Sequence, residues 1–228
     1  MLDVLCFPVI EWDFRFQRPQ QLLTQFARDG HRVFYLRIRF TGLEQDCVEV
    51  REIAEGIYEL GLPGELSTVI YEDRLIEPTL GKALAALKEF ALREGLNEAT
   101  CLVHHPFWEP LVAALKERYG WRIVYDCMDD HSGFKTNSPA VADSETTLVA
   151  KSDLAVATSR KLYQRLRQAH PKCILVPNGA DYAHFSDLPQ RHTSPLANLP
   201  RPVIGYYGAI AEWFDTEAVR LAALRQSV

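Results

Sequence analysis

The chain has 228 residues, 47% of them hydrophobic and 24% charged, which is typical of a globular protein with a substantial core. Its formal net charge of −5 argues against nucleic acid as the main partner. No stretch reaches the ~20 apolar residues of a membrane span, and Asp3 and Glu11 interrupt any secretory signal at the N-terminus. Five scattered cysteines without a C-x-x-C pair are typical of reduced thiols, so we expect a cytoplasmic protein.

Apolar runs alternate with helical patterns along most of the chain. The patterns predict strands over 4–10, 31–38, 100–105, 121–127, 153–158 and 173–179, two short strands within 48–62 around a turn at 55–56, and helices over 19–29, 79–96, 109–119, 144–152 and 159–170. Strands separated by helices form right-handed βαβ units. The fold class is therefore α/β, a Rossmann-like, mostly parallel sheet with helices on both faces.

The pattern changes after Phe185. We expect one Rossmann-like domain over 1–185 and a proline-rich linker over 186–201. Residues 202–228 then hold a strand over 203–210 and a helix capped by Asp215. One strand and one helix cannot bury their own apolar faces. We therefore predict that this segment is the first βα unit of an incomplete second domain.

Ligands of open parallel sheets bind beyond the carboxyl ends of the strands, and the loop after the first strand ends there. It has no glycine, unlike a dinucleotide-binding loop, but contains Trp12, Phe14, Arg15, Phe16 and Arg18. Arg18 lies next to a helix N-terminus, which favours an anion. The aromatic side chains could form a platform for a sugar ring, or they could simply cover the sheet edge.

Two adjacent histidines, His104 and His105, end the strand over 100–105. Either could transfer a proton or bind a hydroxyl. Neighbouring strand residues point to opposite faces, so at most one should face a cleft, and the alternative is one buried and one surface histidine. A zinc site with Cys101 lacks a credible ligand set.

The stretch "YDCMDDHSGF" places Asp126, Asp129, Asp130 and His131 at a strand end and in the following turn. A carboxylate beside other carboxylates can have a raised pKa and act as a base toward a sugar hydroxyl. Alternatively, Asp129 or Asp130 caps a short helix and Asp126 bonds to loop amides.

The stretch "PNGADYAHF" contains an Asn178-Gly179 turn in which glycine can take a positive φ. Asp181 could then cap a short helix.

Five segments in order, "DFRFQRPQQLL", "GHRVFYL", "YDCMDDHSGF", "PNGADYAHF" and "GYYGAIAEWFD", resemble GT-B glycosyltransferases of the group 1, or family 4, type, in particular teichuronic-acid-type and related cell-envelope polysaccharide enzymes. The resemblance implies two Rossmann-like domains, the first for the acceptor and the second for the nucleotide-sugar donor. It implies sugar transfer to a glycan or lipid-linked acceptor, with no cofactor beyond the donor substrate and no metal.

The resemblance also assigns roles. Asp126 stands where many relatives have a histidine and would be the base, with Asp130 or His105 as alternatives, while Arg18 and Gly208 would flank the diphosphate. The full expected substrate-binding set is Trp12, Arg15, Arg18, His104, Asp129, Asn178 and Gly208.

The family's donor-binding residues lie beyond Val228, so we expect this chain to be inactive alone. The rival hypothesis is a non-catalytic module that binds glycans or pairs with a donor-domain polypeptide or itself through the C-terminal helix. The sequence leaves undecided whether the protein also makes peripheral contact with a membrane. A nicotinamide-dependent oxidoreductase is disfavoured because no glycine-rich fingerprint follows a strand.

Overall fold

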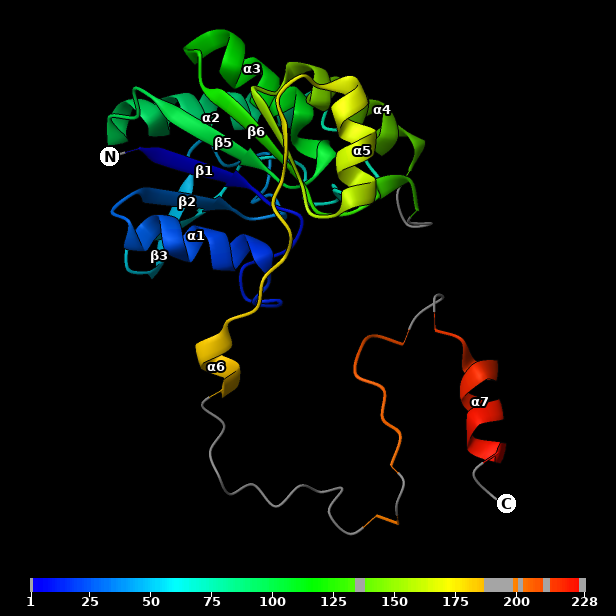
Figure 1. Cartoon of the computed structure of the whole chain (residues 1–228). Coiled ribbons are helices and arrows are strands. Elements are labelled where there is room, and N and C mark those ends of the chain that lie inside the picture. Colours follow the sequence, from blue (N-terminus) through cyan, green and yellow to red (C-terminus); the bar gives the residue numbers. More distant parts are fainter. Residues whose placement is uncertain (1, 134–137, 187–198, 201–202, 211–213, 226–228) are drawn as a thin grey trace. The chain divides into compact units, whose positions relative to one another are not determined.

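The computed structural model describes residues 2–133, 138–186, 199–200, 203–210 and 214–225. The chain divides into two compact units, residues 1–180 and 181–228 (Figure 1).

The first unit alternates strands and helices as the sequence predicts. Its strands are β1 (Asp3–Phe7), β2 (Arg32–Leu36), β3 (Glu49–Ala54), β4 (Ile57–Gly61), β5 (Ala99–Val103), β6 (Arg122–Cys127), β7 (Leu154–Ala157) and β8 (Cys173–Leu175). Its helices are α1 (Arg18–Arg28), α2 (Thr79–Glu94), α3 (Glu109–Tyr119), α4 (Pro139–Lys151) and α5 (Arg160–Ala169), with short 3₁₀ turns η1 (Pro106–Trp108) and η2 (His131–Gly133).

The strands form one eight-stranded sheet in the order β3-β4-β2-β1-β5-β6-β7-β8. All neighbouring pairs are parallel except β3 and β4, which form an antiparallel hairpin at one edge. The predicted Rossmann-like α/β class is therefore confirmed.

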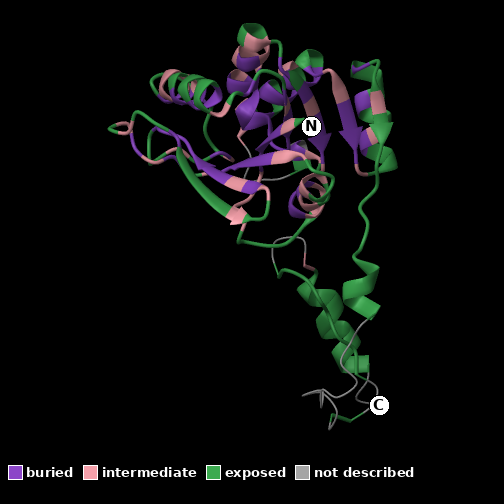
Figure 2. Cartoon of the chain, turned by 90° about the vertical axis from the view of Figure 1, so that its left-hand side faces the viewer, coloured by how far each residue is buried: buried purple, intermediate pink, exposed green. Residues whose placement is uncertain are grey.

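The core has two layers, one on each face of the sheet. On one face, α1 packs Leu23 against a small cluster that includes Cys6 and Tyr35. On the other face, α2 to α5 cover a much larger cluster that includes Tyr125 and Cys127. Figure 2 shows that buried residues concentrate in this sheet and its helices. Successive strand residues alternate between these faces, so Asp126 lies on the α1 side between two residues of the large core.

Local signals fixed several helix ends where the sequence placed them. Gly120 ends α3 in the left-handed conformation with φ 68°, a conformation that glycine adopts without a Cβ clash. Ser159 caps α5, because its side chain accepts a hydrogen bond from the Leu162 amide. Gly120 therefore ends α3 just before β6, and Ser159 begins α5 just after β7.

A polar network around the buried Glu145 carboxylate joins α4 and α5 to β6. Arg165 donates two 2.8 Å hydrogen bonds to the Glu145 carboxylate, and the Tyr125 hydroxyl donates a third at 2.7 Å. Burial acts to raise the pKa of Glu145, but the bonds from Arg165 and Tyr125 outweigh it and lower this pKa. The sequence analysis did not single out this network.

The described residues of the second unit form two helices, α6 (Tyr182–Ser186) and α7 (Thr216–Arg225). Asp215 caps α7 as predicted, accepting from the Ala218 amide at 2.9 Å. The strand predicted over 203–210 is wrong, since these residues form no strand. A strand needs a hydrogen-bonded neighbour, and the described residues of this unit provide none. The linker predicted over 186–201 falls mostly outside the described residues.

Candidate functional site

The carboxyl ends of β1, β5 and β6 lie side by side, because these strands are neighbours in the parallel sheet. The loops that follow them carry most of the residues that the sequence analysis selected. The segment after β8 also reaches this edge, since it contacts Arg18 on α1. The sheet order therefore brings together segments up to 160 residues apart in the chain.

The centre of this edge is an ion pair between Arg18 and Asp126. Arg18 Nε donates to Asp126 Oδ2 at 2.8 Å, and Arg18 Nη2 donates to Asp126 Oδ1 at 3.0 Å. The third guanidinium nitrogen, Nη1, makes longer bonds to the Pro177 carbonyl at 3.3 Å and to Asn178 Oδ1 at 3.4 Å. Two of the guanidinium nitrogens are thus held by short hydrogen bonds, and the third is held only by longer ones.

His104 lies behind this pair. Its Nε2 is 3.5 Å from Asp126 Oδ2, within ion-pair distance, and its Nδ1 is 3.4 Å from Cys6 Sγ. A Cys–His–Asp alignment can activate a thiol. Here Cys6 is fully buried, and burial and the Asp126 charge raise its thiol pKa well above the ordinary value. Cys6 is therefore a neutral packing residue and not a nucleophile.

Asp126 does not have the raised pKa that a carboxylate beside other carboxylates can have. Burial by itself raises the pKa of this carboxyl, but the interactions with His104 and Arg18 outweigh burial and hold the pKa below its ordinary value. The carboxyl group is 1% exposed and is already bonded on both oxygens. A carboxylate in this state is a weak proton acceptor, whereas it is well placed to orient Arg18.

The two adjacent histidines are both buried, so the alternative of one buried and one surface histidine is wrong. His105 packs edge-on against Tyr71 and against His131, with ring centroids 5.5 and 5.0 Å apart. Tyr71 and the η2 turn cover the side on which a strand residue would otherwise reach solvent. Burial, followed by the neighbouring His131, lowers the pKa of His105 to about 3.

A neutral His105 has one protonated ring nitrogen. Its Nδ1 accepts a 3.3 Å hydrogen bond from the Phe107 amide, which assigns the proton to Nε2. In this tautomer His105 is a hydrogen-bond donor at Nε2 and has no free basic nitrogen. The ring is therefore poorly suited to the role of base.

Asp129 and Asp130 lie farther out than Asp126. Asp129 is exposed, and its backbone carbonyl accepts from Cys127 Sγ at 3.4 Å. Asp130 has a side chain about one third exposed and an ion pair with Lys161 at 3.4 Å. The structure thus separates the acidic residues of this stretch into one buried, paired carboxylate and two at the surface.

The loop between β1 and α1 splits its aromatic residues into two groups. Trp12 packs on Tyr35 in the core, with ring centroids 5.1 Å apart. Phe14 and Phe16 are about 60% exposed, and the Arg15 guanidinium lies 4.8 Å from the Phe14 ring centroid. Trp12 therefore anchors the loop, while the other two rings face solvent.

Gln20, which the sequence analysis missed, fixes the shape of this loop. Its buried side chain accepts from the Gln17 amide at 3.1 Å and donates to the Trp12 carbonyl at 3.0 Å, so it joins the two ends of the loop. The signal was present as a glutamine three residues after the helix N-cap, the spacing of a capping box.

The segment after β8 follows the prediction in part. Asn178 contacts Arg18, as described above. Gly179 is not among the glycines with positive φ, so the expected glycine turn is wrong, and no such conformation is required in this extended segment. Asp181 caps α6 by accepting from the His184 amide at 3.1 Å. Gly208 belongs to the second unit, where it is exposed.

Among the residues that the structure describes, no group of three or more His, Cys, Asp or Glu side chains is arranged to hold a metal ion. Within the same residues, no helix combines the length and apolar character needed to cross a membrane. All five cysteines are free thiols, and Cys47 is the exposed one.

No protein-family model matches the chain. No curated protein sequence matches it either.

Solved structures give a clear likeness of fold. A structure of sucrose-phosphate synthase from Thermosynechococcus elongatus superposes with a TM-score of 0.55 and 14% identity over 81% of this chain and 93% of that one. A longer structure of the same synthase gives 0.55 and 16% over 79% of this chain and 49% of that one. The apo structure of OtsA gives 0.51 and 11%, again over 79% and 49%.

The chain therefore spans about half the length of the longer synthase structure and of OtsA. These neighbours are GT-B glycosyltransferases. At 11–16% identity the likeness concerns the fold alone. The chain has the Rossmann-like α/β fold found in one half of these enzymes.

Proposed function

We propose that the chain is the acceptor-side half of a GT-B glycosyltransferase that transfers a sugar from a nucleotide diphosphate sugar to a hydroxyl of a glycan or lipid-linked acceptor. The proposal includes a place in cell-envelope polysaccharide synthesis on the cytoplasmic side. It is supported by the fold shared with sucrose-phosphate synthase and by the site at the carboxyl ends of β1, β5 and β6.

The Arg18 geometry is the observation that carries the proposal. Asp126 fixes Nε and Nη2, so that Nη1 points toward the Pro177–Asn178 segment with only long hydrogen bonds. An oxyanion of the donor diphosphate would replace these long bonds with charge-assisted ones. A cation oriented before the reaction stabilises the charge that develops on the leaving nucleoside diphosphate.

We further propose Asp130 as the base, in place of Asp126. Asp126 is buried and accepts two hydrogen bonds from Arg18. His105 Nδ1 accepts from the Phe107 amide and its Nε2 carries the proton, so neither ring nitrogen is free to accept a proton. Asp130 is partly exposed at the same edge. The acceptor hydroxyl would give its proton to Asp130 while its oxygen bonds to the sugar carbon and the bond from that carbon to the phosphate breaks.

The Arg18 proposal is tested by titrating UDP into the full chain by calorimetry. Arg18→Lys keeps the charge and loses the planar fork, so we expect UDP binding to weaken by about tenfold. Arg28→Lys is the matched control, an exposed arginine at the other end of α1. Thermal unfolding of each variant checks that it is folded. Equal UDP affinity in Arg18→Lys and the unaltered protein would exclude Arg18 from diphosphate binding.

A second candidate function is a non-catalytic glycan-binding or partner-pairing module. It is favoured by α7, whose side chains Val219, Leu221 and Leu224 are 46–55% exposed within their own unit. Binding of an oligosaccharide without any UDP binding would favour this second function. A protein mass in solution of twice 26.0 kDa or more would also favour this second function.

A further inference from the structure

Helix α5 and the residues around it carry positive charge in a chain that is negative overall. Residues 154–180 contain five lysines and arginines and no aspartate or glutamate. The whole chain carries −5, so the remaining residues carry −10. An anionic surface therefore attracts this segment and repels the rest of the chain. The five cations are all exposed: Arg160, Lys161, Arg165, Arg167 and Lys172.

The outer face of α5 is open to a partner. Leu162 and Leu166, four residues apart, pack into the large core, and Tyr163 is partly buried beside them. The cations and the exposed Gln164 and Gln168 occupy the rest of the helix surface. Figure 1 shows α5, in yellow, at the outside of the first unit. The helix thus presents cations and amides to the outside, and no carboxylate of its own.

Carboxylates of the chain engage only two of the five cations. Glu145 accepts two hydrogen bonds from Arg165, and an Asp130 oxygen lies 3.4 Å from Lys161 Nζ. The other three form no ion pair with the residues that the structure describes: Arg160, Arg167 and Lys172. These three unpaired cations are available to an external anion.

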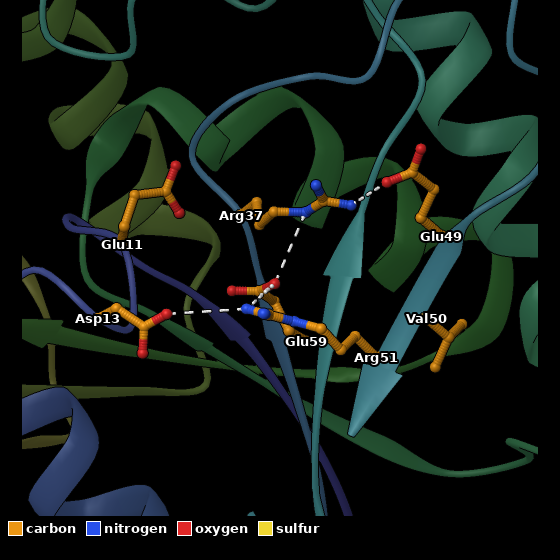
Figure 3. A pocket seen from close by; sticks show the side chains of 7 residues that line it. All are labelled: Glu11, Asp13, Arg37, Glu49, Val50, Arg51 and Glu59. Carbon is orange, nitrogen blue, oxygen red and sulfur yellow. Dashed lines mark hydrogen bonds and ion pairs between the residues drawn. The ribbon is translucent and has the colours of Figure 1, made fainter. Parts of the chain in front are cut away.

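The β3–β4 edge of the sheet shows the opposite arrangement. Arg51 Nη2 lies 2.9 Å from Glu59 Oε2, and Arg37 pairs with Glu49, as Figure 3 shows for the pocket at this edge. Carboxylates of one hairpin thus neutralise both arginines of this pocket. Exposed arginines therefore need not be open to an anion, and the lack of carboxylate partners distinguishes the α5 surface.

Two exposed aromatic rings lie at the edge of the sheet where α5 begins. The loop after β1 and the start of α5 after β7 share the carboxyl edge, three strand steps or roughly 14 Å apart. In that loop Phe14 and Phe16 are exposed, and the Arg15 guanidinium lies over the Phe14 ring. Aromatic rings beside cations suit the boundary of a bilayer, where apolar rings meet acyl chains and cations meet phosphates. A purely polar acidic partner would leave the rings in water.

We infer that α5 and the β1–α1 loop together bind an anionic lipid bilayer, with the three unpaired cations at the lipid phosphates and the two exposed phenylalanine rings among the headgroups. The inference goes beyond the proposed function, because lipid binding needs neither UDP nor sugar transfer. Under that function, the same contact brings a lipid-linked acceptor to the carboxyl edge, since Lys161 at the start of α5 pairs with Asp130.

The test is co-sedimentation of the full chain with vesicles of two compositions, phosphatidylcholine alone and an equimolar mixture of phosphatidylcholine and phosphatidylglycerol. We expect an affinity for the anionic vesicles that is roughly 100-fold higher than for the uncharged ones. Added salt should weaken the binding, because it screens the charges. Equal binding to both kinds of vesicle, or no binding to the anionic ones, would overturn the inference.

Charge variants locate the surface. Binding to the anionic vesicles should weaken by roughly 100-fold in the triple variant Arg160→Gln, Arg167→Gln, Lys172→Gln. The matched control loses the same charge from exposed cations of other helices that also form no ion pair with the described residues: Arg28→Gln, Lys88→Gln, Arg118→Gln. It should keep most of the binding. An equal loss in both triple variants, with normal melting temperatures, would assign the attraction to net charge and contradict the α5 surface.

The aromatic part of the surface has its own variant. Phe14→Ser with Phe16→Ser should weaken vesicle binding by about tenfold, because less apolar area enters the bilayer. The salt dependence should stay the same, since no charge has changed. The control is Val50→Ser with Leu92→Ser, two exposed apolar side chains on β3 and α2. Equal binding by the phenylalanine variant and the unaltered protein would show that the loop does not touch the bilayer.

Two further titrations separate the remaining alternatives. Binding of poly-L-glutamate without binding of vesicles would assign α5 to an acidic protein and overturn the inference. UDP titrated into the α5 triple variant should bind normally, because none of the three cations contacts Arg18 or Asp126. Vesicle binding by a chain that fails to bind UDP would remove the transfer proposal and leave the lipid surface standing.

Discussion

Two arginine–carboxylate pairs, each joined by two hydrogen bonds, lie on opposite faces of β6. On the α1 face Arg18 holds Asp126, and on the other face Arg165 holds Glu145. Tyr125 completes the second pair with a short hydrogen bond, so that pair is internally satisfied. Arg18 instead ends in two long bonds through Nη1. The comparison teaches that completion of the hydrogen bonds, rather than the pair itself, distinguishes a structural network from a candidate binding site.

The two pairs also differ in how much water reaches the arginine. The Arg18 side chain is 9% exposed, whereas the Arg165 side chain is 40% exposed. An arginine that loses its carboxylate can be hydrated only if water reaches it. Removal of the two carboxylates should therefore have unequal costs.

The largest expected effect is that of Asp126→Ala. It leaves the Arg18 charge buried and unpaired, so we expect a loss of about 3–5 kcal/mol of unfolding free energy, measured by urea denaturation. Glu145→Ala should cost less, because Arg165 regains water. The double variant Arg18→Met with Asp126→Leu removes both charges and should recover most of the loss. An equal cost for both single variants would remove the distinction between the pairs.

The second effect is a pH dependence that comes from His105, which packs against Tyr71 and His131. The pKa of His105 is lowered from 6.5 to about 3 in the folded state, so between these values the unfolded chain binds the extra proton. Stability contributed by neutral His105 is therefore complete above about pH 6.5 and decreases as the pH falls toward 3. We expect a loss of about 1 kcal/mol from this residue between about pH 6 and 5.

The control for this pH dependence is His105→Asn, which does not titrate and can still accept from the Phe107 amide. Urea denaturation of both proteins at each pH gives the difference in slope. If the variant shows the same slope as the unaltered protein, His105 is not the group responsible.

The smallest effect belongs to the completed network. Tyr125→Phe removes one of the four hydrogen bonds to Glu145 and leaves both bonds from Arg165 and the one from the Cys127 thiol in place. We expect a loss of about 1 kcal/mol in the urea midpoint analysis. UDP binding should not change, because Tyr125 lies on the face opposite Arg18. A change in UDP affinity would show that the two faces of β6 are coupled.

The sequence by itself determined the elements of the first unit, because their signals are local. Alternating apolar runs predicted the strands, Gly120 ends α3 and Ser159 caps α5. In the second unit, Asp215 caps α7 as expected. Each of these depends on residues within a few positions along the chain. The strand predicted over 203–210 fails for the same reason, since apolar periodicity cannot supply the neighbouring strand that it requires.

Only the tertiary structure decided the states of the candidate site residues. Arg18 and Asp126 are 108 positions apart, and Tyr71 and the η2 turn, which cover His105, come from distant segments. Whether a carboxyl has a raised or lowered pKa depends on which groups surround it, and the order of strands in the sheet sets those neighbours. The sequence therefore placed Arg18 and Asp126 at the same edge of the sheet, while their pairing and the burial of His105 follow from packing alone.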